Sequence, residues 1–148
     1  RDPETANKLR EVDAEEVSDL KDLAARCDVL TFHVPATPAT RGMIDDEFLA
    51  GCRDGAILIN TARGEIVDDE ALLRALDSKG IRAGRDVYNG EPGSAEGEFH
   101  SRLATHPNVY GTHHIGASTE QAQNAIAEEV VRMLEAFGEG NLLHCVNL

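Results

Sequence analysis

Residues 54–70 read DGAILINTARGEIVDDE, and this stretch indicates the fold more clearly than any other. Its apolar run at 56–60 lies between turn-forming residues, which is typical of a strand covered on both faces in a parallel sheet. The run ends in Thr-Ala-Arg-Gly. Open α/β sheets bind ligands beyond the carboxyl ends of their strands, and a guanidinium there suits a carboxylate. Arg63 is therefore a candidate binding residue, with an ordinary surface arginine as the alternative.

Strand and helix signals alternate along the rest of the chain, which predicts an α/β fold built on a parallel sheet. The expected strands cover residues 29–34, 56–60, 82–88 and 108–112. Pro35 ends the first strand, because proline cannot donate a hydrogen bond to a neighbouring strand. A loop rich in glycine, serine and glutamate follows at 89–98, and a short helical piece is expected near 99–103.

The expected helices start at residues whose side chains can accept hydrogen bonds from the first turn, namely Ser18, Asp45, Asp68 and Ser118. The first helix runs to about residue 26, the second covers 46–52, and the third ends at Gly80. Gln121 forms a capping box with Ser118 at the start of the longest helix. Apolar residues at helical spacing give this helix an expected buried face, made of Ala122, Ile126, Val130, Met133 and Phe137.

The composition is that of a single globular domain, with 148 residues of which 41% are hydrophobic. The formal charge is 14 − 27 = −13, which argues against nucleic acid or an anionic membrane as a partner. The sequence has no apolar stretch near the roughly 20 residues that span a bilayer, and no signal peptide opens it. A cytoplasmic location is expected. The cysteines, odd in number and widely spaced, are expected to be reduced and buried: Cys27, Cys52 and Cys145.

Polar side chains follow three of the expected strands: Arg63, then Asp86 and Glu91, then His114. The carboxyl ends of parallel strands share one edge of the sheet, so these residues are expected to converge. Such a set suits acid–base chemistry on a 2-hydroxy or 2-oxo acid. Arg63 would hold the substrate carboxylate, His114 would move the hydroxyl proton, and Glu91 would hold the ring and keep the imidazolium available.

Simpler interpretations of these residues stay open. His113 and His114 could be ordinary polar residues at a strand end, and Asp86 could form an ion pair with Arg85. The histidines between positions 100 and 114 include no pair at the helical His-x-x-x-His spacing, so no metal site is predicted.

Four ordered segments resemble the cofactor-domain half of the D-isomer-specific 2-hydroxyacid dehydrogenases: HVPATPATRGMI, GAILINTARGEIVDDEALLRAL, AGRDVYNGEP and NVYGTHHIGASTEQAQ. The resemblance covers nearly the whole chain and implies a parallel, Rossmann-type sheet with helices on both faces. It also implies that Arg63 is the catalytic arginine that binds substrate, that Glu91 is the catalytic glutamate, and that His114 is the general acid/base.

The same resemblance implies a site for NAD. Asp86 would contact the nicotinamide carboxamide, and Asp2 would bind the ribose. The remaining residues expected to contact the cofactor are His33, Val34, Pro35, Thr61, Ala62, Arg63, His114 and Gly116.

Three features depart from the family pattern. Arg85 stands where relatives usually have an apolar residue in a buried strand. An unpaired buried guanidinium would cost several kcal/mol, so either that strand is exposed or Arg85 has a carboxylate partner. Proline is common where His113 stands. The sequence also has no G-x-G-x-x-G turn, which presents backbone N–H groups to a pyrophosphate.

Without the first strand–helix–strand unit the expected sheet is incomplete. In the strand order 3-2-1-4-5-6 the two missing strands would lie between the strands at 29–34 and 56–60. A second copy of the chain could exchange elements, the strands could close up into a four-stranded sheet, or a separate N-terminal half could fill the gap. Residues 1–148 are interpreted as a partial NAD-binding domain without a substrate domain, from a protein expected to be a homo-oligomer.

The functional hypothesis is an NAD-dependent oxidoreductase that oxidises a D-2-hydroxy acid by hydride transfer, with the 148-residue chain inactive alone. Within the family, the resemblance is greatest to the branch that oxidises 3-phospho-D-glycerate in serine biosynthesis. Two alternatives remain. One is an NAD(H)-sensing protein similar to a co-repressor, with the same Arg-Glu-His set. The other is an engineered or proteolysed half-domain studied for its folding.

Overall fold

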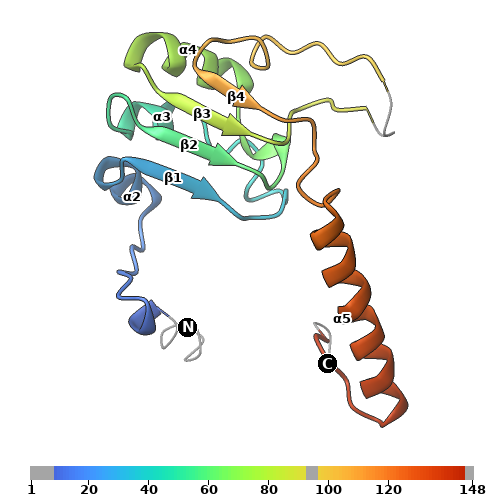
Figure 1. The fold of residues 1–148 in the computed structure, drawn as a ribbon. Helices are drawn as coiled ribbons and strands as arrows, with labels where there is room; N and C mark the ends of the chain where they lie inside the picture. Colours follow the sequence, from blue (N-terminus) through green and yellow to red (C-terminus); the bar gives the residue numbers. More distant parts are fainter. Residues whose placement is uncertain (1–8, 93–96, 146–148) are drawn as a thin grey trace. The chain divides into compact units, whose positions relative to one another are not determined.

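The computed structural model describes residues 9–92 and 97–145. The chain divides into two units, Arg1–Gly111 and Thr112–Leu148, and each is described by itself. The elements along the chain are α2 (Leu20–Arg26), β1 (Val29–Phe32), α3 (Asp46–Gly51), β2 (Ile57–Asn60), the 3₁₀ helix η1 (Gly64–Ile66), α4 (Asp69–Lys79), β3 (Arg82–Arg85), β4 (Val109–Gly111) and α5 (Glu120–Gly138) (Figure 1).

The four strands form one parallel sheet in the order β1-β2-β3-β4, which confirms the predicted α/β class. Leu30 of β1 pairs directly with Leu58 of β2, so no gap separates the first two strands. Each crossover moves the chain one strand further in the same direction, so sequence order and spatial order coincide. Of the three expected ways to complete the sheet, the described residues adopt the four-stranded one.

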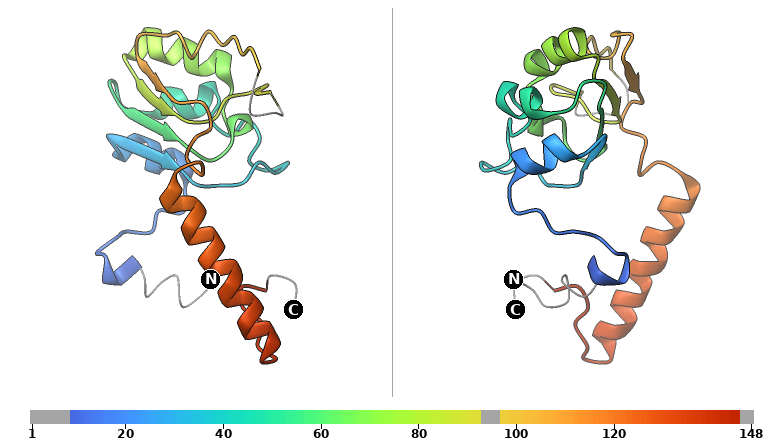
Figure 2. Two further views of the ribbon diagram at one scale, coloured as in Figure 1. Left: turned by 45° about the vertical axis from the view of Figure 1, so that its right-hand side comes forward. Right: turned by 90° about the vertical axis from the view of Figure 1, so that its left-hand side faces the viewer.

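One face of this sheet carries the core of the first unit. The inward strand residues Leu30, Phe32, Leu58 and Ala83 are buried with residues of α3 and α4. The helices α2, α3 and α4 lie on the same side of the sheet (Figures 1 and 2). The opposite face carries half-buried or exposed residues: Val29, Thr31, Ile57, Ile59 and Tyr110. Helix cover, predicted for both faces, is thus found on one face within the described part of this unit.

Helix capping follows the sequence closely at two starts and is displaced by one residue at two others. Asp45 accepts a hydrogen bond from Phe48 N (2.9 Å), and Asp68 accepts from Glu70 N and Ala71 N (both 3.0 Å), as predicted. Gly80 ends α4 in the left-handed conformation, at φ 63°. Two other starts were predicted wrongly: Asp19, not Ser18, caps α2, and Thr119, not Ser118, caps α5.

The strands are shorter than the sequence predicts at their carboxyl ends. β1 ends at Phe32 rather than at 34, and β3 ends at Arg85 rather than at 88. The chain leaves the ladder there to form the loops that carry the candidate site. The predicted helical piece at 99–103 is wrong, because the chain instead forms a turn at 102–105.

In the second unit, the apolar stripe of α5 is exposed rather than buried. Ile126 is 53%, Val130 49% and Phe137 67% accessible, so the predicted buried face is wrong for this unit taken by itself. The helical spacing shows that one face is apolar but does not show what covers it.

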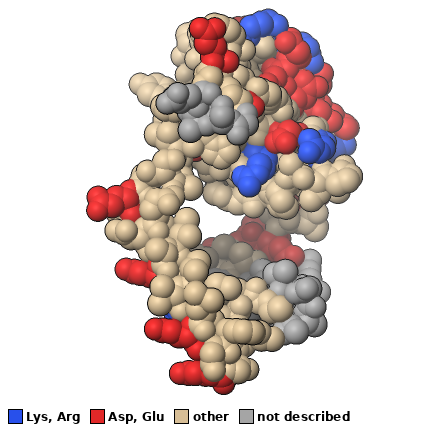
Figure 3. All heavy atoms as spheres, turned by 90° about the vertical axis from the view of Figure 1, so that its right-hand side faces the viewer, with Lys and Arg blue, Asp and Glu red and all other residues tan. Residues whose placement is uncertain are grey.

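More acidic than basic side chains lie on the face of the molecule drawn in Figure 3. Among the described residues, no helix has the length and apolar character needed to cross a membrane.

The three cysteines are free thiols in different environments. Cys52 is buried, its Sγ donates to Phe48 O (3.5 Å), and burial raises the pKa of its thiol against a smaller opposing effect of Lys79. Cys27 is half-buried and Cys145 is exposed. The predicted burial is therefore confirmed for Cys52 and wrong for Cys145.

Candidate active site

The turn at residues 61–64, called the Arg63 turn below, follows β2. Its backbone is held by hydrogen bonds from the last side chain of that strand. Asn60, the last residue of β2, is 3% exposed. Its Nδ2 donates to Arg63 O (2.9 Å), and its Oδ1 accepts from Ala62 N (3.0 Å). The Arg63 side chain is exposed, and its Nη1 donates to Ala62 O (2.6 Å). A buried amide thus holds the turn while the guanidinium remains open to solvent.

The loop that follows β1 fixes the chain just beyond this turn. Gly42 N donates to Glu65 O (2.9 Å) and Ile44 N donates to Ile66 O (3.0 Å). Asp68 N donates back to Ile44 O (3.0 Å). These backbone bonds tie the loop that follows β1 to the segment that follows β2, so the position of the Arg63 turn depends on both connections.

Gly64 packs the Arg63 turn against the loop that follows β3. A Cβ built on Gly64 would lie 2.2 Å from Tyr88 C, 2.3 Å from Tyr88 O and 2.7 Å from Asn89 N. All three are backbone atoms, so glycine is required for this close approach. Asn89 adds a hydrogen bond from its Nδ2 to Val67 O (3.1 Å).

Replacing Gly64 by alanine is expected to separate these two segments and to destabilise the fold by about 1–3 kcal/mol, because a methyl group forced against backbone cannot be relieved by a rotamer change. Urea unfolding followed by circular dichroism would measure the loss. Gly51→Ala is the control, since a Cβ on Gly51 meets nothing within 4 Å. A Gly64→Ala variant as stable as wild type would show that the contact is not required.

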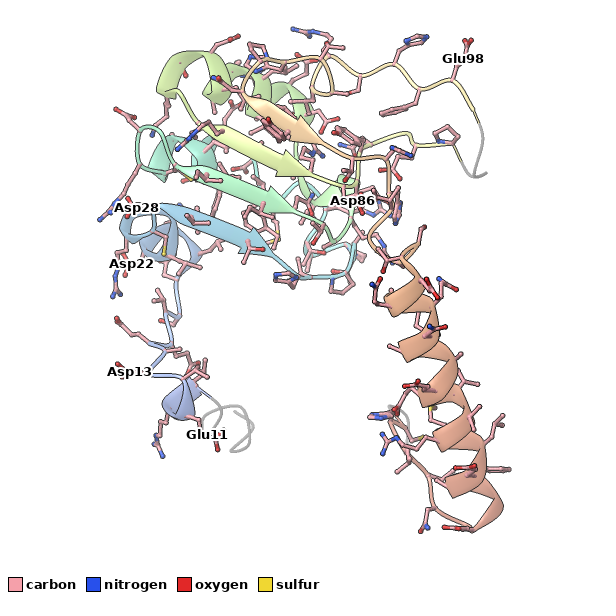
Figure 4. All side chains as sticks on the ribbon, in the orientation of Figure 1. Glu11, Asp13, Asp22, Asp28, Asp86 and Glu98 are labelled. Carbon is pink, nitrogen blue, oxygen red and sulfur yellow. The ribbon has the colours of Figure 1, made fainter. Side chains whose placement is uncertain are left out.

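Residues 86–91, called the 86–91 segment below, carry the two candidate carboxylates. Asp86 is 6% exposed, just beyond the end of β3, and its N–H donates to Asn60 O (3.1 Å) (Figure 4). Glu91 is half-buried, and its Oε1 accepts a hydrogen bond from Tyr88 N. The segment thus turns back on itself so that Glu91 is held by a backbone amide three residues earlier.

The structure explains how an arginine is accommodated at position 85 of a buried strand. The strand is not exposed there: the Arg85 side chain is 1% accessible and forms an ion pair with Asp69 (Nη1 to Oδ1, 3.0 Å). The second of the two expected explanations, a carboxylate partner, is confirmed. That partner comes from the first turn of α4, not from the neighbouring Asp86.

The residues expected on the NAD side of the site lie at the carboxyl ends of β1 and β2. His33 is exposed and its Nε2 lies 3.0 Å from Thr31 Oγ1; Val34 is half-buried and Pro35 is exposed. Thr61 is exposed and Ala62 is half-buried. These two extended segments offer backbone groups and accessible side chains at neighbouring strand ends, a donor set that suits a dinucleotide in an α/β sheet. Asp2 lies outside the described residues.

His114 and Gly116 belong to the second unit. His114 has φ 58°, a left-handed conformation that few residues other than glycine adopt, and Ser118 N closes the following turn onto Ile115 O (2.9 Å). The structure therefore brings the Arg63 turn and the 86–91 segment together. The convergence of His114 with them stays a prediction.

Sequence reasoning missed three residues that build this site, Asn60, Gly64 and Tyr88. Asn60 and Gly64 carried a detectable signal, since an amide ends an otherwise apolar strand and a glycine directly follows the arginine. Tyr88 gave no such signal, because its role comes from contacts distant in sequence.

The sheet is parallel, and the Arg63 turn and the acidic 86–91 segment pack together beyond the carboxyl ends of its strands. This is the arrangement of an α/β protein of the Rossmann type, which binds ligands at that edge. Residues 1–116 match the family model described as D-isomer specific 2-hydroxyacid dehydrogenase, NAD binding domain. The chain belongs to this family.

Named relatives agree with this assignment. The chain is 42% identical over 143 residues to D-3-phosphoglycerate dehydrogenase of Haemophilus influenzae, covering 95% of this chain and 35% of the relative. It is 41% identical over 144 residues to D-3-phosphoglycerate dehydrogenase 1 of Saccharomyces cerevisiae, covering 90% and 31%. The chain thus spans about a third of the length of these curated relatives.

Solved structures give the same result. The apo form of D-mandelate dehydrogenase from Rhodotorula graminis superposes with a TM-score of 0.77 at 30% identity, covering 89% of this chain and 37% of that one. D-lactate dehydrogenase from Aquifex aeolicus, complexed with NAD and lactic acid, superposes with a TM-score of 0.71 at 34% identity, covering 90% and 44%.

Proposed function

We propose that the full-length protein is an NAD-dependent dehydrogenase that oxidises a D-2-hydroxy acid, with 3-phospho-D-glycerate as its substrate. Family membership supports the reaction class, and the identity of about 40% to two D-3-phosphoglycerate dehydrogenases supports the substrate. The observation that carries the proposal is the contact of Gly64 with Tyr88 and Asn89, because it places the Arg63 turn beside the segment that carries Glu91.

Each catalytic residue has a separate part in the proposed reaction. Arg63 binds the substrate carboxylate through its planar, permanently charged guanidinium. His114 accepts the proton of the 2-hydroxyl group as the carbon–hydrogen bond breaks, and the product is the 2-oxo acid. Glu91 holds the resulting imidazolium. NAD supplies the acceptor for the hydride that leaves carbon 2.

His114 follows β4 closely in the sequence. It follows Gly111, the last residue of β4, by three positions, and three residues span at most about 11 Å. This short connection supports the proposal that His114 acts together with Arg63 and Glu91, because β4 belongs to the same parallel sheet as the strands that precede those two residues.

The cofactor would be held by residues of the same strand ends. Asp86 would bind the nicotinamide carboxamide, and the segments His33 to Pro35 and Thr61 to Ala62 would line the two sides of the dinucleotide. The pyrophosphate cradle is not among these residues, because the sequence has no G-x-G-x-x-G turn. We therefore expect activity from the full-length homo-oligomeric protein and not from residues 1–148 alone.

Absorbance of the reduced nicotinamide tests this function. Full-length protein is mixed with NAD and 3-phospho-D-glycerate, then with the D and L isomers of lactate and other small 2-hydroxy acids. The proposal predicts cofactor reduction with D isomers and the highest kcat/KM with 3-phospho-D-glycerate. If no hydroxy acid is turned over while NADH still binds, the protein is an NAD(H)-sensing binding protein instead.

Glu91→Gln is expected to shift the pH–rate profile of carbonyl reduction. Reduction needs protonated His114, and a neutral amide no longer stabilises the imidazolium. The upper limb of the profile therefore moves toward acid. Steady-state rates across pH would measure this shift. Glu98→Gln, in the loop beyond the segment, is the control, and an unshifted profile in Glu91→Gln would leave Glu91 with a structural role only.

A further inference from the structure

The buried Arg85 guanidinium is only partly satisfied. Its Nη1 pairs with Asp69 Oδ1 at 3.0 Å, while its Nε and Nη2 have no hydrogen-bond partner within the part of the chain that the structure describes. Its Cζ lies 5.0 Å from the centre of the Tyr88 ring, a distance at which a cation is attracted to an aromatic face. A buried charge with so few hydrogen-bond partners costs stability, so an apolar side chain would serve better if filling space were the only role of this position.

Tyr88, the aromatic partner of Arg85, contacts three parts of the first unit that lie at the carboxyl ends of its strands. Its N–H donates to Glu91 Oε1, and its carbonyl group lies against Gly64. Its hydroxyl group lies against Gly111, where an added Cβ would be 1.9 Å away. Its ring also packs on Phe99, with centroids 5.6 Å apart. A shift of Tyr88 would therefore move the Glu91 carboxylate, the Arg63 turn and the end of β4 together.

Asp69 gives this cluster a fixed anchor. It is the first residue of α4, directly after the cap Asp68, and its side chain is 27% exposed. The Arg85–Asp69 pair thus ties the end of β3 to the start of α4, while the Arg85–Tyr88 contact ties the same guanidinium to the 86–91 segment.

We infer that Arg85 is a positioning residue, which uses Asp69 as anchor and Tyr88 as contact to hold the Glu91 carboxylate in its working position. This inference deepens the proposed function and rests on it for the role of Glu91. An apolar residue at position 85 would fill the same volume, but it would lack the directional bond to Asp69 and the attraction to the Tyr88 ring.

The two members of the ion pair are expected to respond differently to substitution. Arg85→Met removes a buried charge that is incompletely bonded and leaves Asp69 partly solvated at a helix N-terminus, so the melting temperature stays equal or rises. Asp69→Asn leaves the buried guanidinium without its anion, so the melting temperature falls by several degrees. Arg85→Met is therefore a variant that folds while lacking the positioning contacts.

The test compares wild type, Arg85→Met and Arg85→Lys in the full-length enzyme, with Arg82→Met as matched control from the exposed face of the same strand. In Arg85→Met we expect amide hydrogen exchange in the 86–91 segment to rise about tenfold and kcat to fall about 10- to 100-fold. The upper limb of the reduction pH profile should move toward acid, as in Glu91→Gln. Arg85→Lys should recover part of each effect, and Arg82→Met should change none.

Unchanged exchange and an unshifted profile in Arg85→Met would overturn the inference. Faster exchange with an unshifted profile would also overturn it, because the segment would then be loosened without any effect on Glu91. If full-length wild type turns over no 2-hydroxy acid, the proposed function is wrong. The exchange measurement then decides alone, with faster exchange supporting the positioning of the segment and unchanged exchange rejecting it.

Discussion

His114→Ala in the full-length enzyme is expected to lower kcat by two to four orders of magnitude, the usual contribution of a positioned general acid or base. Without the imidazole, the proton of the 2-hydroxyl group must pass to water during hydride transfer. KM for the hydroxy acid should change much less, because Arg63 still binds the carboxylate. Steady-state rates of NAD reduction would measure both constants.

The neighbouring His113→Ala provides the control for this substitution, since it removes an imidazole next in sequence that has no part in the proposed reaction. Added imidazole should restore part of the activity of His114→Ala by acting as a diffusible base. Wild-type turnover in His114→Ala would contradict the assignment of His114 as the group that moves the proton.

Arg63→Lys is expected to reduce kcat/KM by about 10- to 150-fold, which corresponds to the roughly 1.5–3 kcal/mol of a hydrogen bond to a charged group. Lysine keeps the charge, but its ammonium group cannot make the two parallel bonds that a guanidinium makes to a carboxylate. Most of the loss should appear in KM for the hydroxy acid, while the binding of NAD should be nearly unchanged.

Arg41→Lys is the matched control for Arg63→Lys, because Arg41 is also an exposed arginine near the Arg63 turn. Its Nη1 lies 3.6 Å from Glu65 Oε1. Its kcat/KM should remain close to wild type. Equal losses of kcat/KM in both variants would indicate a general effect of replacing a surface arginine by lysine. An unchanged kcat/KM in Arg63→Lys would show that Arg63 does not bind the substrate.

The sequence predicted the parts of this fold that depend on local chemistry. The strand at 56–60, the caps Asp45 and Asp68 and the left-handed Gly80 each follow from residues close in sequence, and the structure confirms them. The two displaced caps have local causes as well. Ser18 and Ser118 each stand directly before a second capping residue, and composition alone does not decide which of the two takes the role.

Features that depend on distant contacts could not be predicted from the sequence. The direct pairing of Leu30 with Leu58 is a matter of strand order, and the strand sequences do not encode which strand lies beside which. The exposed stripe of α5 shows the same limit, because its spacing predicts an apolar face and not the surface that covers it. Tyr88 contacts residues 64, 85, 91 and 111, which are spread along the chain, so no local sequence pattern indicated its role.

The candidate site lies between these two cases. Arg63, Glu91 and His114 were proposed because they follow strand ends. The structure packs Gly64 of the Arg63 turn against Tyr88 and Asn89 of the segment that carries Glu91, and the convergence of the three side chains stays a prediction. The choice of Asp69 as partner of Arg85 required the structure, because α4 and β3 meet only in the folded chain.

A crystal structure of the full-length protein with NAD and a 2-oxo acid would test most directly whether Arg63, Glu91 and His114 form one site. We expect the substrate carboxylate within about 3 Å of the Arg63 guanidinium, the 2-oxygen within the same distance of a His114 ring nitrogen, and the Glu91 carboxylate on the other ring nitrogen. A substrate bound away from Arg63, or an imidazole that reaches neither the 2-oxygen nor Glu91, would contradict the proposed mechanism.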